Sequence, residues 1–96
     1  MSLDPLIHPP ARLQIMAVLG GVSEMEFAKL REILGVSDSV LSKHISALMQ
    51  ADYVRQRKAA LDGRQRTWLI RTGPGRRAFE AHIAELQRIA GLVPRK

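Results

Sequence analysis

The chain has 96 residues, of which 46% are apolar and 25% charged, so it has the size and balance of one folded domain covering residues 1–96. It has no cysteine, which excludes disulfides and thiolate metal sites, and no apolar run long enough to span a bilayer. Its first residues lack the basic start and apolar core of a signal peptide, so we expect a cytoplasmic protein without a membrane partner.

The net charge of +6 is concentrated in residues 55–77. This segment holds eight basic residues and one acidic residue, whereas residues 1–54 carry a net charge of −2. A basic segment on a folded domain indicates a polyanionic partner. The alternative is a solvated surface that is rich in arginine.

Two helices are expected in residues 10–34. The first should begin at Pro10, where proline is tolerated, and stop at Gly20-Gly21. The second should begin near residue 24 or 26, because Ser23 and Glu26 have the spacing of a capping box. A short strand near Glu24-Met25 that joins a later hairpin is the competing interpretation, and the sequence leaves both open.

A third helix is expected to begin at Ser37 or Asp38, two residues after the second helix ends. So short a connection predicts a helix-turn-helix at about residues 24–51. Leu41, Ile45 and Leu48 form the apolar side of the third helix. The opposite side carries short polar residues and a single charge, in Ser39, Ser42, Lys43, Ser46 and Gln50.

This polar side is predicted to enter the DNA major groove. Small side chains allow close approach, and hydroxyls and the free N–H groups of the first helical turn can bind base edges or phosphates. The alternative is an ordinary solvated side that is rich in serine by chance.

Residues 53–71 are predicted to form a basic hairpin. Two extended runs, 53–60 and 66–71, flank Asp62-Gly63, which is a strong hairpin signal. Arginine and lysine on such a hairpin can contact phosphates or enter the minor groove, with Asp62 orienting Arg64. The basic residues assigned to DNA here are Arg57, Lys58, Arg64 and Arg66.

In the second run of this hairpin, the alternation of side chains places Trp68 and Ile70 on one side and Leu69 on the other. We expect Trp68 and Ile70 to face the core, since a lone tryptophan among apolar residues usually packs inside. Trp68 as a platform on which bases stack is the alternative.

A last helix is expected at about residues 73–90, capped by Thr72. Its apolar stripe is long for a domain that is too small to cover it alone, which predicts a dimer interface. Packing of this stripe on the first helix of the same chain is the alternative. The residues assigned to the interface are Phe79, Ile83, Leu86, Ile89 and Ala90 of this helix, with Leu3, Leu6 and Ile7 of the N-terminal arm.

The sequence predicts no enzyme activity, no cofactor and no metal site. His8, His44 and His82 are far apart and lack the short ligand spacings of a metal site. Ser42 and His44 lie two residues apart on a helix, so their side chains diverge. We expect His44 to be a partly buried, hydrogen-bonded histidine at the helix edge.

The order and spacing of these pieces resemble the winged-helix transcriptional regulators of the MarR and ArsR type, and most of all the short, single-domain, MarR-like proteins. The resemblance is carried by "LDPLIHPPARLQIMAVL", "EFAKLREILGVSDSVLSKHISALMQADYV", "DGRQRTW" and "RTGPGRRAFEAHI". It implies a mainly α (α+β) fold with three helices, a two- or three-stranded wing hairpin at about residues 53–71 and a C-terminal dimerisation helix. The chain departs from the pattern at Asp52, where glycine is usual, and at Arg71, where leucine is usual.

The resemblance also implies a function. It predicts a homodimeric, sequence-specific regulator of transcription, with the third helix in the major groove of double-stranded DNA and the wing on the backbone or in the minor groove. A small-molecule effector is a further partner that it implies. The alternative is a winged-helix module that binds protein or RNA. The complete set of residues assigned to DNA is Ser37, Asp38, Ser39, Ser42, Lys43, Ser46, Arg57, Lys58, Arg64 and Arg66.

Overall fold

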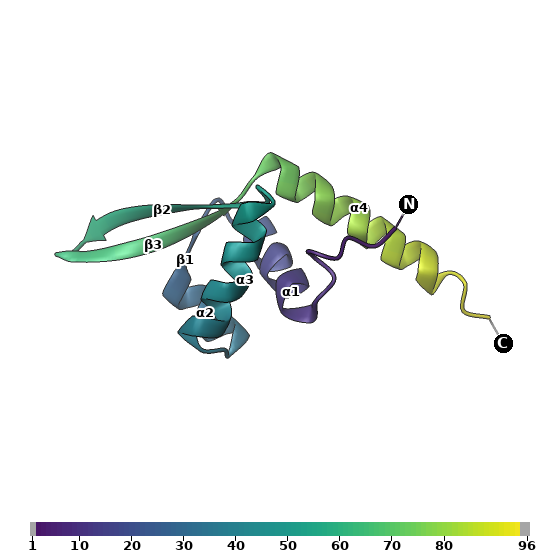
Figure 1. Cartoon of the computed structure of the whole chain (residues 1–96), viewed down its shortest axis with the longest axis horizontal. Helices are drawn as coiled ribbons and strands as arrows, with labels where there is room; N and C mark the ends of the chain where they lie inside the picture. Colours follow the sequence, from purple (N-terminus) through teal and green to yellow (C-terminus); the bar gives the residue numbers. More distant parts are fainter. Residues whose placement is uncertain (1, 95–96) are drawn as a thin grey trace.

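The computed structural model describes residues 2–94 and shows four helices and a small antiparallel sheet (Figure 1). This is the predicted α+β winged helix-turn-helix, with the three-stranded version of the hairpin. The elements in chain order are α1 (Pro10–Gly20), β1 (Met25–Glu26), α2 (Phe27–Leu34), α3 (Asp38–Gln50), β2 (Val54–Leu61), β3 (Arg64–Arg71) and α4 (Gly73–Ala90).

The sheet has the strand order β1-β3-β2, so the short β1 pairs with the second strand of the hairpin. Met25 lies opposite Leu69, and Glu26 lies opposite Trp68. Glu26 is therefore extended and α2 begins only at Phe27, without a side-chain cap. The capping-box prediction is wrong, because pairing with β3 holds Glu26 outside the first helical turn that the box requires.

The hairpin of β2 and β3, which we call the wing, is closed by the predicted Asp62-Gly63 turn. Asp62 has φ 53° and Gly63 has φ 76°, and Leu61 pairs with Arg64 directly before and after them. Positive φ at both central residues matches the right-handed twist of the strands in a two-residue hairpin. Within residues 2–94, Asp62 and Arg64 form no ion pair, so the expected orientation of Arg64 by Asp62 is not seen.

The core lies where α1, α2, α3 and one face of the sheet meet. Leu69 of β3 is completely buried there, whereas Trp68 and Ile70 are half-buried on the opposite face. The prediction that Trp68 and Ile70 face the core is wrong, because the strand register puts Leu69 on the same face as Val54 and Met25, and this is the face that packs on the helices. The buried apolar residues are Ile7, Ile15, Met16, Leu19, Leu30, Leu41, Ile45, Leu48, Val54 and Leu69.

The junction from α3 to β2 explains the unusual Asp52. Its φ is 62°, in the left-handed region that glycine adopts at low cost. The N–H of Asp52 donates to the Met49 carbonyl, and the N–H of Tyr53 donates to the Leu48 carbonyl. These two bonds are the Schellman motif that ends a helix, so Asp52 occupies its left-handed position.

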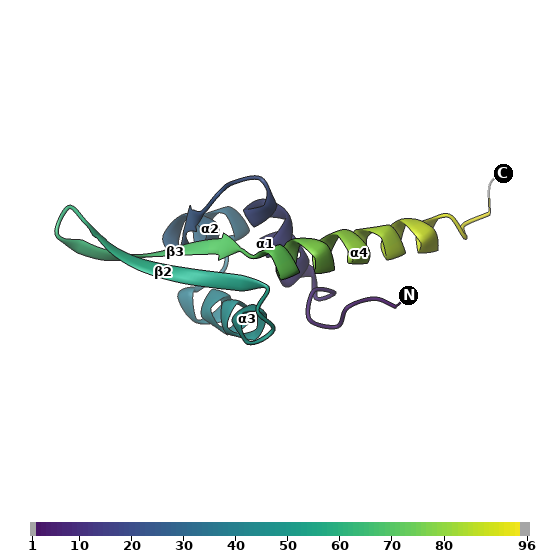
Figure 2. The same ribbon diagram turned by 90° about the horizontal axis from the view of Figure 1, so that it is seen from above.

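The first turn of α4 is joined to this same junction. The Thr72 hydroxyl accepts a hydrogen bond from the Gly75 N–H and donates one to the Asp52 carbonyl at 2.6 Å. From this anchor α4 projects away from the helices at the end opposite to the wing, and the chain measures 59 × 25 × 21 Å. The N-terminal arm runs beside α4 in both views (Figures 1 and 2).

Candidate nucleic-acid interface

The polar side of α3 is fixed at the surface by the burial of its other side. Ser37 caps the helix by accepting a hydrogen bond from the Val40 N–H at 3.2 Å. The apolar side of the helix is in the core, so the opposite side stays in solvent. Five residues of α3, which we call the reading side, are all exposed: Ser39, Ser42, Lys43, Ser46 and Gln50.

The start of α3 is ordered by local polar contacts. Asp38 forms an ion pair with Arg31 of α2 at 2.9 Å, and both side chains remain exposed to solvent. The hydroxyls of Ser37 and Ser39 lie 3.2 Å apart. Ser37, Asp38 and Ser39 therefore make exposed polar contacts at the helix-turn-helix corner, and their contact with DNA stays a prediction.

The four wing cations assigned to DNA fall into two pairs. Arg57 is bound to Glu24 and Arg66 to Glu26, both at 2.7 Å. Among the described residues, Lys58 and Arg64 form no ion pair. The sequence pattern missed this division because the two carboxylates come from the β1 segment, more than thirty residues earlier in the chain.

On the face of the sheet that turns away from the helices, an arginine lies over the only tryptophan of the chain. The Arg57 guanidinium lies 5.8 Å from the centre of the Trp68 ring, within the range of a cation–π contact. Arg57 also binds Glu24, so this arginine is held from two sides. Trp68 thus contributes to the wing by packing under a positive group, on the face that turns away from the core.

The residues assigned to the dimer interface do not all lie at the surface. Leu3, Leu6, Phe79, Ile83 and Leu86 are half-buried, and Ile89 and Ala90 are exposed. Ile7 is completely buried in the core of its own chain, so we remove it from the predicted interface, since its side chain has no surface to offer.

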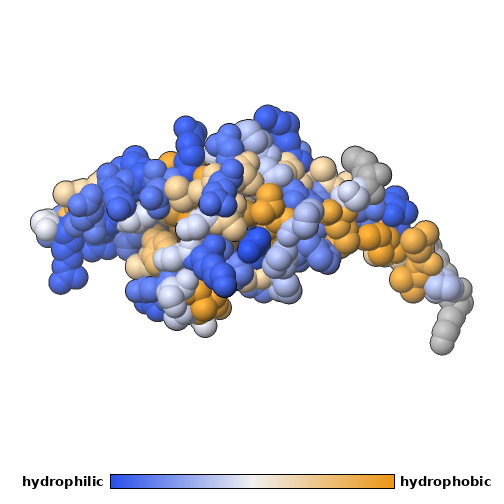
Figure 3. Space-filling view, viewed as in Figure 1, coloured by the Kyte–Doolittle hydropathy of each residue, from blue (hydrophilic) through white to orange (hydrophobic). Residues whose placement is uncertain are grey.

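Apolar surface continues along the outer half of α4, as Figure 3 shows, while hydrophilic residues cover the wing. Leu92 and Val93 follow the helix and are 69% and 68% exposed. Both residues lie beyond the predicted end of the helix and were therefore not assigned to the interface, although two apolar residues directly after Gly91 indicate that the stripe extends further.

A hydrogen-bonded chain that the sequence did not predict ties the N-terminal arm to α4 and to the end of α3. The Asp4 N–H donates to His82 Nδ1 at 3.0 Å, and the Tyr53 hydroxyl donates to the Asp4 carboxylate at 2.7 Å. His82 is 1% exposed, and its Nε2 lies 3.4 Å from His8 Nδ1. Because His82 Nδ1 accepts a hydrogen bond, the proton of its neutral ring is on Nε2.

His44 is a partly buried, hydrogen-bonded histidine at the edge of α3, as predicted. Its Nδ1 accepts a hydrogen bond from Arg12 Nε of α1 at 3.1 Å. Burial, with the nearby charges of Arg12 and Lys43, lowers the pKa of His44 below its ordinary value. The neutral ring that results is the form that can accept from an arginine. Residues 2–94 bring together no group of three or more histidine, aspartate or glutamate side chains that could hold a metal ion.

Comparison with known proteins gives one family. The winged helix DNA-binding domain family matches residues 11–90. An uncharacterized protein of Methanocaldococcus jannaschii is 33% identical over 85 residues, which are 88% of this chain and 92% of that protein. No helix within residues 2–94 is both long and apolar enough to cross a bilayer.

Solved structures have the same fold. A transcriptional regulator homologue from Pyrococcus horikoshii superposes with a TM-score of 0.84 at 24% identity, covering 90% of this chain and 85% of that one. A MarR protein from Peptoclostridium difficile superposes with a TM-score of 0.69 at 20% identity, covering 88% of this chain and 54% of that one.

The fold and the family match define a winged-helix protein. The chain belongs to the winged helix DNA-binding domain family, and its fold is that of the MarR-like regulators.

Proposed function

We propose that two copies of this chain form a dimer that recognises a specific sequence in double-stranded DNA. The geometry of α3 carries the proposal: its apolar side is locked in the core, and its serine-rich reading side is left free. In this arrangement α3 enters the major groove and the wing contacts the backbone or the minor groove. Bound DNA would leave α4 free to join the two copies.

The charges of the interface support DNA as the partner. Lys43 on the reading side and Lys58 and Arg64 on the wing have no carboxylate partner within residues 2–94, so they are available to phosphates. Arg57 and Arg66 contribute by exchanging their carboxylates for phosphates. Each neutralised phosphate releases counterions, which makes the logarithm of affinity fall with the logarithm of salt concentration by about 0.9 per contact.

The salt dependence of binding tests the electrostatic part of the proposal. A labelled duplex selected from a random pool is titrated by fluorescence anisotropy over a salt series, beside a shuffled duplex of equal length. We expect a steep loss of affinity with salt for both duplexes and tighter binding of the selected one. A flat salt response, or failure of any duplex to be selected, would refute DNA binding.

Two lysine variants, each of which removes one positive charge, distinguish contacts with the bases from contacts with the phosphates. Lys43→Ala should reduce the preference for the selected duplex over the shuffled one, because Lys43 lies on the reading side. Lys58→Ala should weaken both duplexes alike and reduce the salt slope of the dimer by about 1.8, which is about 0.9 for each copy, because it contacts only phosphate. Equal effects of the two variants on preference would contradict the assignment of α3 to the bases.

The dimer is supported by the apolar surface of the outer half of α4. Ile89 is 38% exposed there, and Ile33 of α2 is 49% exposed away from α4. Ile89→Asp should convert the dimer to a monomer in sedimentation experiments and weaken binding to a two-fold site, whereas the matched Ile33→Asp should remain dimeric. A native chain that sediments as a monomer at micromolar concentration would refute the dimer.

We propose that a small-molecule effector binds between the N-terminal arm and α4. An apolar cavity of about 520 Å³ lies between the arm, α1 and α4, and is lined by residues that include His8, Leu13 and Leu86. A ligand there would touch both the arm and the dimer helix. Titrating small aromatic compounds against the protein–DNA complex tests this, and a release of DNA that Leu13→Ala abolishes would support the site.

A further inference from the structure

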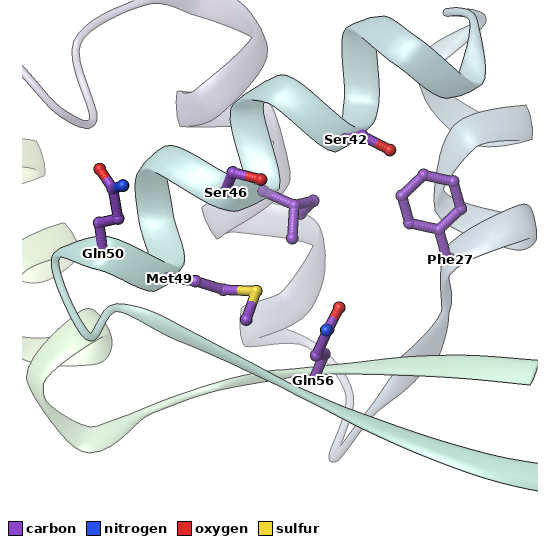
Figure 4. A pocket seen from close by; sticks show the side chains of 7 residues that line it. Phe27, Ser42, Ser46, Met49, Gln50 and Gln56 are labelled. Carbon is purple, nitrogen blue, oxygen red and sulfur yellow. The ribbon is translucent and has the colours of Figure 1, made fainter.

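A groove runs along the flank of the reading side, between α3, the first residue of α2 and strand β2. Its volume is about 440 Å³. Phe27, Ile45 and Met49 supply apolar surface to it, Ser42 and Ser46 line it from α3, and Gln56 lines it from the wing. In Figure 4 the Met49 thioether and the Phe27 ring face the space between the helix and the strand.

None of the residues that line this groove is charged. A phosphate would lose its hydration here without gaining a cation, although Lys58 and Arg64 are available elsewhere on the wing. Apolar atoms together with neutral hydroxyl and amide groups instead suit a neutral ligand with one apolar and one polar edge. The chemistry of the groove therefore favours a base edge over the sugar–phosphate backbone.

The groove opens on the side of α3 that is assigned to the major groove. Ser42 and Ser46 belong both to its wall and to the exposed reading side. In the major groove of DNA, thymine is the one base that presents an apolar substituent, its C5-methyl group, next to the O4 acceptor. Methionine and aromatic carbons can contact the methyl group while a serine hydroxyl donates to O4.

We propose that this groove, which we call the methyl groove, reads a thymine in each half-site of the bound DNA. Met49 and Phe27 contact the C5-methyl group, and Ser42 or Ser46 donates a hydrogen bond to O4. The inference rests on the proposed DNA recognition and adds to it the base and the residues that select it. It makes Met49 a specificity-determining residue although it lies beside the polar reading side and is itself apolar.

Deoxyuridine tests the proposal directly, because it is thymidine without the methyl group and keeps every hydrogen-bonding atom. Each thymidine of the selected duplex is replaced in turn, and affinity is measured by anisotropy at one salt concentration. At one symmetry-related pair of positions we expect about a fourfold loss per half-site, which is the value of one buried methyl group. Replacement at the other positions should leave affinity unchanged.

Variants of residues that line the groove test whether they cause the loss of affinity for the deoxyuridine duplex. Met49→Ala should bind the thymidine and deoxyuridine duplexes equally, while the control Ile33→Ala should keep the discrimination of the native chain. Ser46→Ala removes a hydroxyl at nearly constant shape and should weaken both duplexes alike. Circular dichroism and thermal melting confirm that each variant is folded before binding is compared.

The outcomes separate this inference from the function on which it rests. Tight, salt-dependent binding with no position sensitive to deoxyuridine overturns the methyl groove and leaves DNA recognition standing. Full discrimination retained by Met49→Ala overturns it as well. A methylphosphonate linkage replaces one charged phosphate of the duplex by a neutral group. If it weakens binding next to a thymidine whose replacement by deoxyuridine has no effect, the groove contacts the DNA backbone and the methyl groove is overturned. If no duplex is selected from the pool, both proposals fail together.

Discussion

Replacing Gly75 by alanine should destabilise the protein strongly, although alanine is the better helix former. A Cβ at this position would lie 2.9 Å from the Tyr53 carbonyl carbon and 3.0 Å from Tyr53 Cα, with the carbonyl oxygen closer still. These are backbone atoms of the α3–β2 junction, so they cannot rotate away as a side chain can. The first turn of α4 would have to move away from the α3–β2 junction.

The cost follows from what that movement breaks. Overpacking of this kind costs about 1–3 kcal/mol. Separation would also stretch the hydrogen bonds from the Thr72 N–H to Tyr53 and from the Thr72 hydroxyl to Asp52, each contributing about 1 kcal/mol. Against this, the change of glycine to alanine in a helix gains about 0.5–1 kcal/mol. We expect a net loss of about 3 kcal/mol, which lowers Tm by roughly 12–24 °C in a domain of this size.

Gly73→Ala is the matched control on the same helical turn. Its Cβ would meet only the flexible Arg77 guanidinium, at 3.4 Å, so stability should be unchanged or slightly higher. Thermal melts of the three proteins at one concentration measure the difference, because the Tm of a dimer depends on concentration. If Gly75→Ala melts at or above Gly73→Ala, the close packing of α4 on the junction is refuted.

Three further predictions concern the ends of α3 and the arm. Ser37→Ala should cost about 1 kcal/mol in urea denaturation by removing the helix cap, whereas Ser39→Ala, which caps nothing, should cost much less. Asp52→Gly should stabilise by about 1 kcal/mol, because it relieves a left-handed backbone, and an unchanged or lower denaturation midpoint would contradict this. The hydrogen bond to Asp4, then burial and the Asp4 charge, raise the pKa of Tyr53, the only tyrosine. Its neutral form is favoured in the folded state, so this stabilisation is present below about pH 10 and lost as pH rises through the raised pKa. Asp4→Asn should lower the pKa in a spectrophotometric titration.

Much of the fold is local, and local signals predicted it. The helices are readable because apolar residues recur every three or four positions, and Leu41, Ile45 and Leu48 are buried as their spacing predicts. Asp62-Gly63 specifies its turn through two positive φ angles, and Thr72 caps α4 through a bond to a residue three positions later. Each of these signals depends only on neighbours in the chain.

The interpretations that failed depend on which distant segments pair. The period of two along β3 separates Leu69 from Trp68, but only the register with β2 and β1 decides which of them meets the helices. The same pairing with β3 turned the capping-box segment into a strand and left Glu26 extended. Local spacing does not specify the register, and it left the third strand as one of two open interpretations.

For the candidate interface, the sequence alone determined which residues are polar, basic and on one side of a helix. Only the tertiary structure decided which of them are free: β1 brings Glu24 and Glu26 to Arg57 and Arg66, while Lys58 and Arg64 remain unpaired within residues 2–94. It also buried Ile7 and opened an apolar groove beside the serines. The physical reason is that helix periodicity acts over a few residues, whereas ion pairs and grooves form between segments that only the folded chain brings together.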